Sequence, residues 1–303
     1  MALSKNRSND GIFIISGKRT PFGRFGGALK DISPVDLAVF ASKALLEECK
    51  ISAEKIDHVI LGNVVPSSTD TLYGARHLGL KLGCKISTPG LVVNRLCGSG
   101  IQAIMDATRL ILLDEAECVL AAGTENMSMA PHLTYGGRFG TKYGQLKSVD
   151  MLLDALTDQY VQTPMGITAE NLAQNFDITR PVCDEFSFAS HKKAIEAYEK
   201  NLLQGEIASV KAGAMTCERD EHLRLDVSLK ELNGLRSTFK KDGVVTAGSA
   251  SGVVDGAAAV LVASGGFCEK NGLTPLAEII DGHVVGVDPK IMGIGPSPAI
   301  SAL

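Results

Sequence analysis

Short apolar runs alternate with longer amphipathic stretches along this chain. Apolar runs bounded by turn residues are typical of strands, and stretches of helical periodicity between them are typical of α/β proteins. We therefore predict an α/β fold. Ser33 is suited to cap the first helix with its side-chain oxygen, and Pro34 is suited to the first helical position, where no N–H is needed. The expected strands cover residues 11–16, 58–64, 91–94, 118–122 and 257–263, and the expected helices between them cover residues 34–49 and 100–113.

The pattern also predicts how the chain is divided into domains. Charge and Gly- or Pro-containing turns become more frequent from residue 126, one clear helix is expected over residues 184–201, and small apolar residues return at 252–262. A weak repeat of the N-terminal pattern follows, with a strand-like segment at 276–280 and a second Ser-Pro pair at 297–298. We predict a discontinuous core domain (residues 1–125 and 246–273), an inserted domain (126–245), and the start of a second α/β domain (274–303) that continues beyond this sequence.

Composition excludes several classes of partner. The 303 residues are 45% hydrophobic and carry a net charge of -4, with 30 basic and 34 acidic residues interspersed. No basic stripe indicates nucleic acid, no cationic face indicates a membrane surface, and no apolar stretch approaches the roughly 20 residues that span a bilayer. The start, MALSKNRSNDG, is polar and does not resemble a targeting segment. We expect a soluble cytoplasmic protein whose partner is a small molecule.

Cysteines and histidines do not indicate a metal site or a disulfide framework. Seven cysteines, an odd number, contain no Cys-x-x-Cys pair, and six histidines show no metal-ligand spacing. Free cysteines are most often small buried hydrophobes, so each needs a special context before a chemical role is assigned to it. We expect structural roles for Cys49, Cys84, Cys118, Cys183, Cys217 and Cys268.

Cys97 has such a context. It lies in Asn-Arg-Leu-Cys-Gly-Ser-Gly at residues 94–100, between a β-branched strand and an apolar helix. We predict that these residues form a strand-to-helix turn, here called the elbow. Unpaired N–H groups and the positive end of the helix dipole favour a thiolate there, and the glycines permit close approach of a substrate. The residues alone leave two interpretations open, which are a nucleophile and a Gly-rich turn that happens to hold a cysteine.

Two further features have ordinary explanations on the residues alone. Residues 244–252, Val-Val-Thr-Ala-Gly-Ser-Ala-Ser-Gly, hold more small residues than a solvent loop needs. Such residues admit a ligand close to the backbone, but on the residues alone we favour the other explanation, tight packing between neighbouring strands. Arg224, beside Asp220 and Glu221, would be a routine surface charge in most proteins.

Several strings together resemble the thiolase family, in particular its branch of mitochondrial-type 3-ketoacyl-CoA thiolases. The strings around Cys97 and Ser251 are highly specific, and the matching stretches run from end to end of the chain. They are Lys-Arg-Thr-Pro-Phe-Gly at 18–23, Leu-Gly-Asn-Val at 61–64, residues 94–100, Gly-Thr-Glu-Asn-Met-Ser at 123–128, Thr-Ala-Glu-Asn-Leu at 168–172, residues 245–256, and Met-Gly-Ile-Gly-Pro at 292–296.

The resemblance implies a layered thiolase-like fold and an acetyl-CoA C-acyltransferase of fatty acid β-oxidation. Cys97 would take the acyl group as a covalent thioester, and coenzyme A (CoA) would be a substrate rather than a permanently bound cofactor. Arg224 and Ser251 match positions that hold CoA, although Val227 stands where family members often have a hydroxyl group. The inserted domain corresponds to a loop domain that covers CoA and helps to assemble homodimers and tetramers.

This sequence also departs from the family pattern. The histidine of Gly-His-Pro, the oxyanion loop Asn-Glu-Ala-Phe and the second cysteine of the family have no counterpart within the 303 residues. We therefore expect the chain to be inactive alone and a companion chain or further sequence to supply them. The alternative is a non-catalytic half-thiolase that binds CoA or a partner chain. A ketoacyl synthase shares the fold and the cysteine elbow, but the strings around Cys97 and Ser251 disfavour it.

Overall fold

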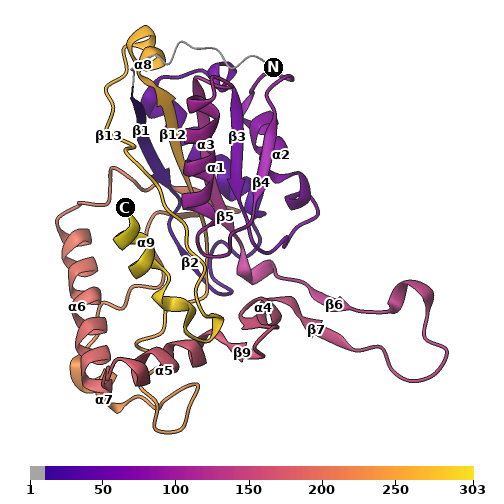
Figure 1. Ribbon diagram of the computed structural model, residues 1–303, viewed down its shortest axis with the longest axis vertical. Coiled ribbons are helices and arrows are strands. Elements are labelled where there is room, and N and C mark those ends of the chain that lie inside the picture. The colour runs from indigo at the N-terminus through magenta and orange to yellow at the C-terminus, as the bar shows by residue number, and fades with distance from the viewer. Residues whose placement is uncertain (1–10) are drawn as a thin grey trace. The chain divides into compact units, whose positions relative to one another are not determined.

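The computed structural model describes residues 11–303, and their contacts form two compact units (Figure 1). The first unit holds the described part of Met1–Ala130 together with Gly205–Glu221 and Val253–Ile280. The second holds Pro131–Gln204, His222–Gly252 and Asp281–Leu303. The interpretation of the polar start as a segment without targeting character concerns residues 1–10, which lie outside the described residues.

The first unit is built on one mixed sheet, in the order β13-β1-β12-β5-β3-β4. β3 runs parallel to β4 and β5, while β12 runs antiparallel to β5 and β1. The predicted α/β class is therefore confirmed. The strands of this sheet are β1 (Ile12–Arg19), β3 (His58–Gly62), β4 (Gly90–Val93), β5 (Cys118–Glu125), β12 (Val254–Ser264) and β13 (Ala277–Glu278), with the short β2 (Gly23–Arg24) paired to β12.

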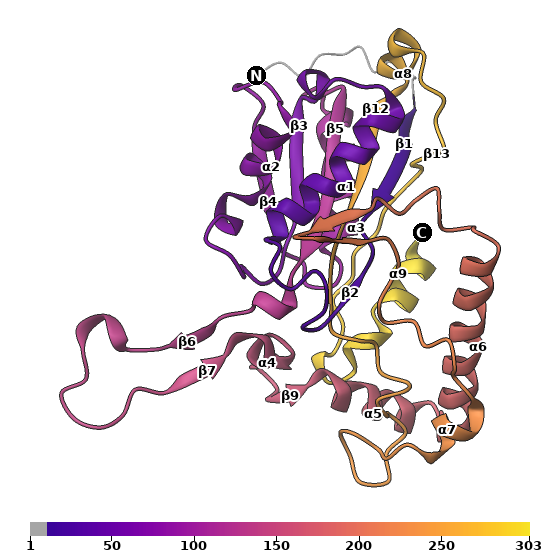
Figure 2. The ribbon, with the colours of Figure 1, turned by 180° about the vertical axis from the view of Figure 1, so that it is seen from behind.

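Helices cover both faces of this sheet. α1 lies on one face and α3 on the other, as the views from front and back show (Figures 1 and 2). The predicted cap of α1 is confirmed, because the Ser33 side chain accepts a hydrogen bond from the Asp36 N–H and Pro34 opens the helix. The helices of this unit are α1 (Pro34–Cys49), α2 (Gly74–Leu82), α3 (Ser99–Leu112) and α8 (Gly265–Asn271), with the 3-10 turns η1 (Ala53–Lys55), η2 (Thr71–Tyr73) and η3 (Met127–Met129).

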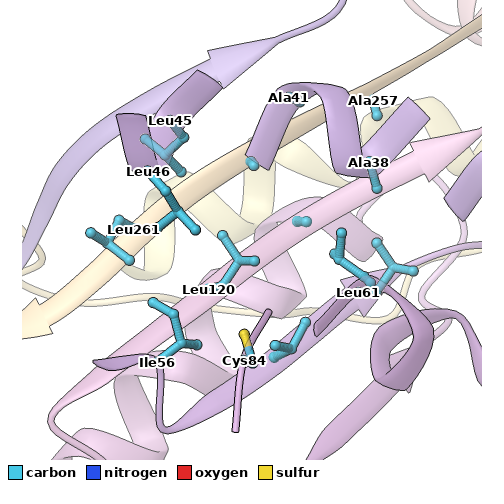
Figure 3. Packing of buried hydrophobic residues seen from close by; sticks show 14 of the residues in the cluster. Ala38, Ala41, Leu45, Leu46, Ile56, Leu61, Cys84, Leu120, Ala257 and Leu261 are labelled. Carbon is cyan, nitrogen blue, oxygen red and sulfur yellow. The ribbon is translucent and has the colours of Figure 1, made fainter. Parts of the chain in front are cut away.

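Strand alternation divides the core between these two faces. On β5, Leu120 packs with α1 and α2, whereas Val119 and Ala121 pack with α3. Figure 3 shows the first cluster, in which Leu120 and Leu261 of neighbouring strands meet Leu45 and Leu46 of α1. Successive side chains of a strand point to opposite faces, so a run of apolar residues is needed where both faces are covered.

The second unit is formed by helices and short hairpins. Arg180 joins α6 to the α7 turn, because its guanidinium donates to Asp184 at 2.7 Å and to the carbonyl oxygens of Leu232 and Leu235 at 2.6 and 3.0 Å. The elements are β6 (His132–Thr134), η4 (Gly137–Phe139), β7 (Ser148–Asp150), α4 (Met151–Ala155), β8 (Thr157–Asp158), β9 (Thr163–Pro164), α5 (Met165–Asn175), α6 (Arg180–Glu199), α7 (Leu229–Gly234), η5 (Pro289–Ile294) and α9 (Pro296–Ala302).

Residues 205–221 lie inside the predicted insertion and contact β1. The Arg19 N–H donates to the Glu206 carbonyl oxygen at 2.9 Å, and the Ala208 N–H donates to the Arg19 carbonyl oxygen at 2.7 Å. This segment also forms the hairpin β10 (Val210–Ala212) and β11 (Met215–Cys217). The domain boundaries drawn from the sequence remain a prediction. Among the helices within residues 11–303, none is both long and apolar enough to cross a bilayer.

Candidate functional site

Cys97 lies at the turn between β4 and the start of α3, and its side chain is exposed. The preceding residue, Leu96, has a φ of 47°, in the left-handed region that a branched side chain rarely adopts. Such a conformation persists only where neighbouring groups hold it, and it is typical of functional turns. The predicted strand-to-helix elbow is therefore present around Cys97.

The hydroxyl group of Ser99 closes this turn from the helix side. It accepts a hydrogen bond from the Arg95 N–H at 2.8 Å and donates one to the Leu96 carbonyl oxygen at 2.6 Å. The Ser99 side chain is buried, in contrast to Arg95, Leu96 and Cys97 around it. One buried hydroxyl group thus fixes the backbone on both sides of the strained residue and leaves the thiol accessible.

Glycines set how closely the elbow approaches the sheet. A Cβ atom on Gly62 of β3 would lie 2.8 Å from the carbonyl carbon of Ser99, so only glycine fits beneath the helix start. A Cβ atom on Gly100 would meet nothing within 4 Å. The elbow is therefore tightly packed on the side that faces β3 and has free space around Gly100.

The start of α3 also offers N–H groups to an anion. Within the described residues, the amides of Gly100 and Ile101 in the first turn donate to no carbonyl or side-chain acceptor. The N-cap residue, Gly98, has no side chain that could occupy them. Unpaired amides and the helix dipole stabilise negative charge near a helix start. These amides can therefore stabilise negative charge that develops near the start of α3.

The other cysteines are less accessible than Cys97. Four of them are buried and two are half-buried. Burial raises the pKa of the Cys118 thiol, and it raises the pKa of the Cys84, Cys217 and Cys268 thiols in the same way. These environments support the structural roles expected for them, which remain a prediction.

Arg224 and Ser251 line one cavity of the second unit, with a volume of about 740 Å³. Residues of α6, the segment 222–227, α7 and the small-residue segment 247–252 form its walls. The structure therefore brings together these two predicted residues, which are 27 positions apart. Val227 also lines the cavity, at the position where a hydroxyl group was expected from the family pattern.

Two histidines of this cavity were missed by the sequence reasoning. His191 and His222 both line it, and burial, followed by the charges of His222 and Arg224, lowers the pKa of His191. They are 31 residues apart in the sequence, so no spacing signal could have paired them. Basic and acidic groups both face the cavity, because Asp226 and Glu231 belong to its lining.

Two glycines of segment 244–252 are closely packed inside the second unit. A Cβ atom on Gly248 would lie 2.5 Å from Leu232, and one on Gly252 would lie 2.3 Å from the His222 ring. The glycines therefore let this segment approach α7 and His222. The packing is thus against α7 and His222 rather than between neighbouring strands. The same glycines also line the cavity, so close packing does not exclude a ligand there.

Glu170 of α5 holds the beginning of this segment, and the sequence reasoning did not find it. Its carboxylate is buried and accepts the N–H groups of Val244 and Val245, each at 2.9 Å. The separation of 74 residues leaves no local signal for such a contact. Glu170 thereby positions the chain that leads to Ser251.

Within residues 11–303, no group of three or more His, Cys, Asp or Glu side chains could hold a metal ion. Cys97 belongs to the first unit, and the cavity with Arg224 and Ser251 belongs to the second.

Comparison with known proteins places these features in context. Residues 12–266 match the family described as thiolase, N-terminal domain. The chain is 49% identical over 296 residues to the mitochondrial 3-ketoacyl-CoA thiolase of Homo sapiens, and the match covers 96% of this chain and 75% of that protein. It is 42% identical to the acetyl-CoA acetyltransferase of Cupriavidus necator, with 95% and 75% covered.

Solved structures agree with these relatives. Human mitochondrial 3-ketoacyl-CoA thiolase in complex with CoA superimposes with a TM-score of 0.94 at 49% identity, covering 96% of this chain and 74% of that chain. The Bacillus anthracis acetyl-CoA acetyltransferase superimposes with a TM-score of 0.92 at 38% identity, covering 97% and 75%. The predicted layered fold is thus confirmed, and the chain spans about three quarters of the length of these proteins.

Proposed function

This chain belongs to the thiolase family of acyltransferases, and on that premise we propose that it moves acyl groups to and from CoA through a thioester on Cys97. The observation that carries the proposal is the elbow, where an exposed cysteine lies two residues before the start of α3. Covalent catalysis suits this reaction because it divides one difficult step into two exchanges between thioesters.

The proposed chemistry begins with the Cys97 thiolate attacking the C3 carbonyl carbon of a 3-ketoacyl-CoA. The C2–C3 bond then breaks, its electron pair stays on C2, and protonation of C2 releases acetyl-CoA. The thiolate of a second CoA attacks the acyl thioester, takes the shortened acyl group and frees the Cys97 sulfur. The reverse sequence condenses two acyl-CoA molecules. The amides of Gly100 and Ile101 would stabilise negative charge close to the sulfur.

CoA is proposed to bind in the cavity of the second unit. Arg224 supplies a fixed positive charge for a phosphate group, and the small residues around Ser251 leave the backbone accessible to the pantetheine. The solved human relative that superimposes on this chain is a complex with CoA. Val227 adds an apolar wall where a hydroxyl group would have offered a polar contact.

The proposed turnover needs groups that these 303 residues do not contain. No Gly-His-Pro or Asn-Glu-Ala-Phe string occurs in them, and we propose that a companion chain or further sequence supplies the proton acceptor for the attacking thiol and part of the oxyanion site. One missing oxyanion donor alone costs about 2.7–4 kcal/mol of barrier. We therefore propose that the chain by itself forms the acyl adduct slowly, and that turnover depends on the missing groups.

Three further expectations remain proposals. A homodimer or tetramer, a cytoplasmic location and a part in fatty acid β-oxidation rest on the family resemblance alone. Several relatives carry the name mitochondrial. Cell fractionation of the native protein would separate a cytoplasmic location from a mitochondrial one.

The intact mass of the protein after incubation with acetoacetyl-CoA tests the proposal. We expect an acetyl adduct in the wild type and none in the Cys97→Ser variant, while Cys183→Ser, at a half-buried thiol, still forms it. An adduct that persists in Cys97→Ser would overturn the role of Cys97. A folded wild type that binds CoA without forming an adduct would favour the alternative, a non-catalytic half-thiolase.

CoA binding is tested separately by calorimetry. We expect Arg224→Ala to weaken CoA binding by tenfold or more, since a charge-assisted contact is worth about 1.5–3 kcal/mol. Arg236 is exposed and does not line the cavity, so Arg236→Ala is the matched control. Equal losses in both variants would show only a general effect of charge.

A further inference from the structure

We propose that Asn94 is a positioning residue for Cys97 and acts as a two-ended clamp on the elbow, an inference that rests on the proposed function. Its side-chain oxygen Oδ1 accepts the Leu96 N–H at 3.0 Å, and its Nδ2 donates to the Val64 carbonyl oxygen at 3.3 Å. One amide side chain therefore ties the residue before the nucleophile to the loop that follows β3.

The loop at the far end of this clamp is itself firmly held. Glu125, at the end of β5, accepts the N–H groups of Val64 and Val65 and the Nδ2 of Asn63, all at 3.0 Å. The Asn63 N–H also donates to the carbonyl oxygen of Val93, the last residue of β4, at 3.1 Å. Val64 is thus a rigid anchor, because a carboxylate with several donors fixes its backbone.

The clamp holds Leu96, the residue of the elbow whose backbone conformation is unfavourable. Leu96, with its φ of 47°, would relax to negative φ in a free chain, since its Cβ atom disfavours the left-handed region. Asn94 Oδ1 holds the Leu96 N–H, and the Ser99 hydroxyl group holds the Leu96 carbonyl oxygen. Relaxation of Leu96 would rotate the next peptide and thereby shift the Cys97 side chain.

The exposure of Asn94 indicates that it positions the elbow and does not contribute to the hydrophobic core. The side chains of Asn94 and Leu96 are both exposed, so shortening Asn94 opens no cavity. The clamp should therefore matter for the position of the thiol and little for global stability.

The test measures the rate of acetyl adduct formation on Cys97 with acetoacetyl-CoA in wild type, Asn94→Ala, Leu96→Gly and the double variant. We expect Asn94→Ala to slow acylation by about tenfold to a hundredfold, because a misplacement near 1 Å costs up to that much. The acetoacetyl-CoA concentration at half-maximal rate and the urea midpoint should stay unchanged. In the Leu96→Gly background the loss should shrink, since glycine adopts positive φ freely.

Asn271→Ala is the matched control. Its amide also donates to a main-chain carbonyl oxygen, that of Phe267 in α8, at 2.8 Å. This variant should acylate at the wild-type rate. Acylation of Asn94→Ala at the wild-type rate would overturn the proposal, and so would a loss that Leu96→Gly leaves unchanged.

A second readout keeps this test independent of the proposed function. Iodoacetamide alkylates Cys97 without any CoA site, and we expect Asn94→Ala to change that rate several-fold while Leu96→Gly restores it. If the wild type forms no acetyl adduct, the proposed function fails, and the alkylation rates alone decide the role of Asn94. Equal alkylation in wild type and Asn94→Ala would then overturn the clamp.

Discussion

Arg19 and Asp220 are joined by two parallel hydrogen bonds, 2.7 Å from Nη1 to Oδ1 and 3.0 Å from Nη2 to Oδ2. Both side chains are largely buried, with 15% and 18% of their surface exposed. The Asp220 carboxylate also accepts the Phe22 N–H at 2.7 Å. This pair links the end of β1 to the segment 205–221 of the same unit. Bidentate pairing of this kind depends on the planar guanidinium group.

Arg19→Lys should therefore destabilise the fold although the charge is kept. Lysine cannot make both bonds to Asp220, so we expect the free energy of unfolding in urea to fall by about 1.5–3 kcal/mol. Arg109 makes a single bond to Asp106 on an exposed helix face, and Arg109→Lys should change the free energy by less than about 0.5 kcal/mol. Equal effects in the two variants would contradict a special role for the Arg19 pair.

Iodoacetamide should label Cys97 before any other cysteine of the folded protein. Cys97 is exposed, whereas burial hinders access to Cys118 and raises the pKa of its thiol, which keeps it protonated and unreactive. Peptide mapping by mass spectrometry after short labelling would read this order. In guanidinium chloride, which unfolds the protein, the preferential labelling of Cys97 should disappear. Labelling of Cys49 or Cys183 before Cys97 in the native protein would contradict the prediction.

Gly62→Ala should disturb the elbow, whereas Gly100→Ala should not destabilise the protein. The new Cβ atom at position 62 would lie 2.8–2.9 Å from backbone and side-chain atoms of Ser99. Such overpacking costs about 1–3 kcal/mol of unfolding free energy. Alanine at position 100 meets nothing within 4 Å and should stabilise α3 by up to about 1 kcal/mol. Urea denaturation measures both, and a tolerated Gly62→Ala would argue against tight packing beneath Ser99.

Glu170→Ala should release the segment that leads to Ser251. Removing a buried carboxylate leaves the N–H groups of Val244 and Val245 without their acceptor, a loss on the order of 3 kcal/mol. Glu170→Gln keeps one acceptor oxygen and should lose less. Limited proteolysis would detect faster cleavage within residues 240–252, with exposed Glu196→Gln as the control. Cleavage unchanged in Glu170→Ala would refute the anchoring role.

His58 should make the protein less stable in mild acid. Burial lowers the pKa of His58 in the folded state, so folding favours its neutral form. This contribution to stability is full above the unfolded pKa of about 6.5 and is lost as the pH falls through the lower folded value. The urea midpoint of His58→Gln should therefore fall less than that of the wild type between about pH 7.5 and 5.5. Parallel curves in this interval would exclude His58 as a source of the pH dependence.

Local signals predicted much of the secondary structure. Helix α1 covers residues 34–49 as predicted, because its cap, its first-turn proline and its apolar periodicity agree. Helix α6 begins at Arg180 rather than at residue 184, and Pro181 in its first turn is the signal that was missed. The strand predicted over 276–280 is only Ala277–Glu278, where it pairs with Phe13 and Ile14 of β1.

The residues of the candidate site also divide into those that a local motif predicted and those that only the structure revealed. Cys97 was found from its motif, since a cysteine, two glycines and a helix start lie within a few residues of each other. The sequence did not reveal Glu170, Glu125 and His191. The two glutamates bind N–H groups dozens of positions away, and His191 lines a cavity with residues equally distant in the sequence. The roles of Cys97, Arg224 and Ser251 in acyl transfer and CoA binding remain predictions.

By itself the sequence determined the α/β class, the boundaries of α1, the elbow around Cys97 and the family. The tertiary structure decided that β12 lies between β1 and β5, that Asp220 pairs with Arg19, and that Arg224 and Ser251 share a cavity. Caps, turns and periodicity depend on residues a few positions apart, which the chain order already specifies. Contacts between distant residues depend on how the elements pack to bury their apolar faces, and this packing is a property of the whole fold.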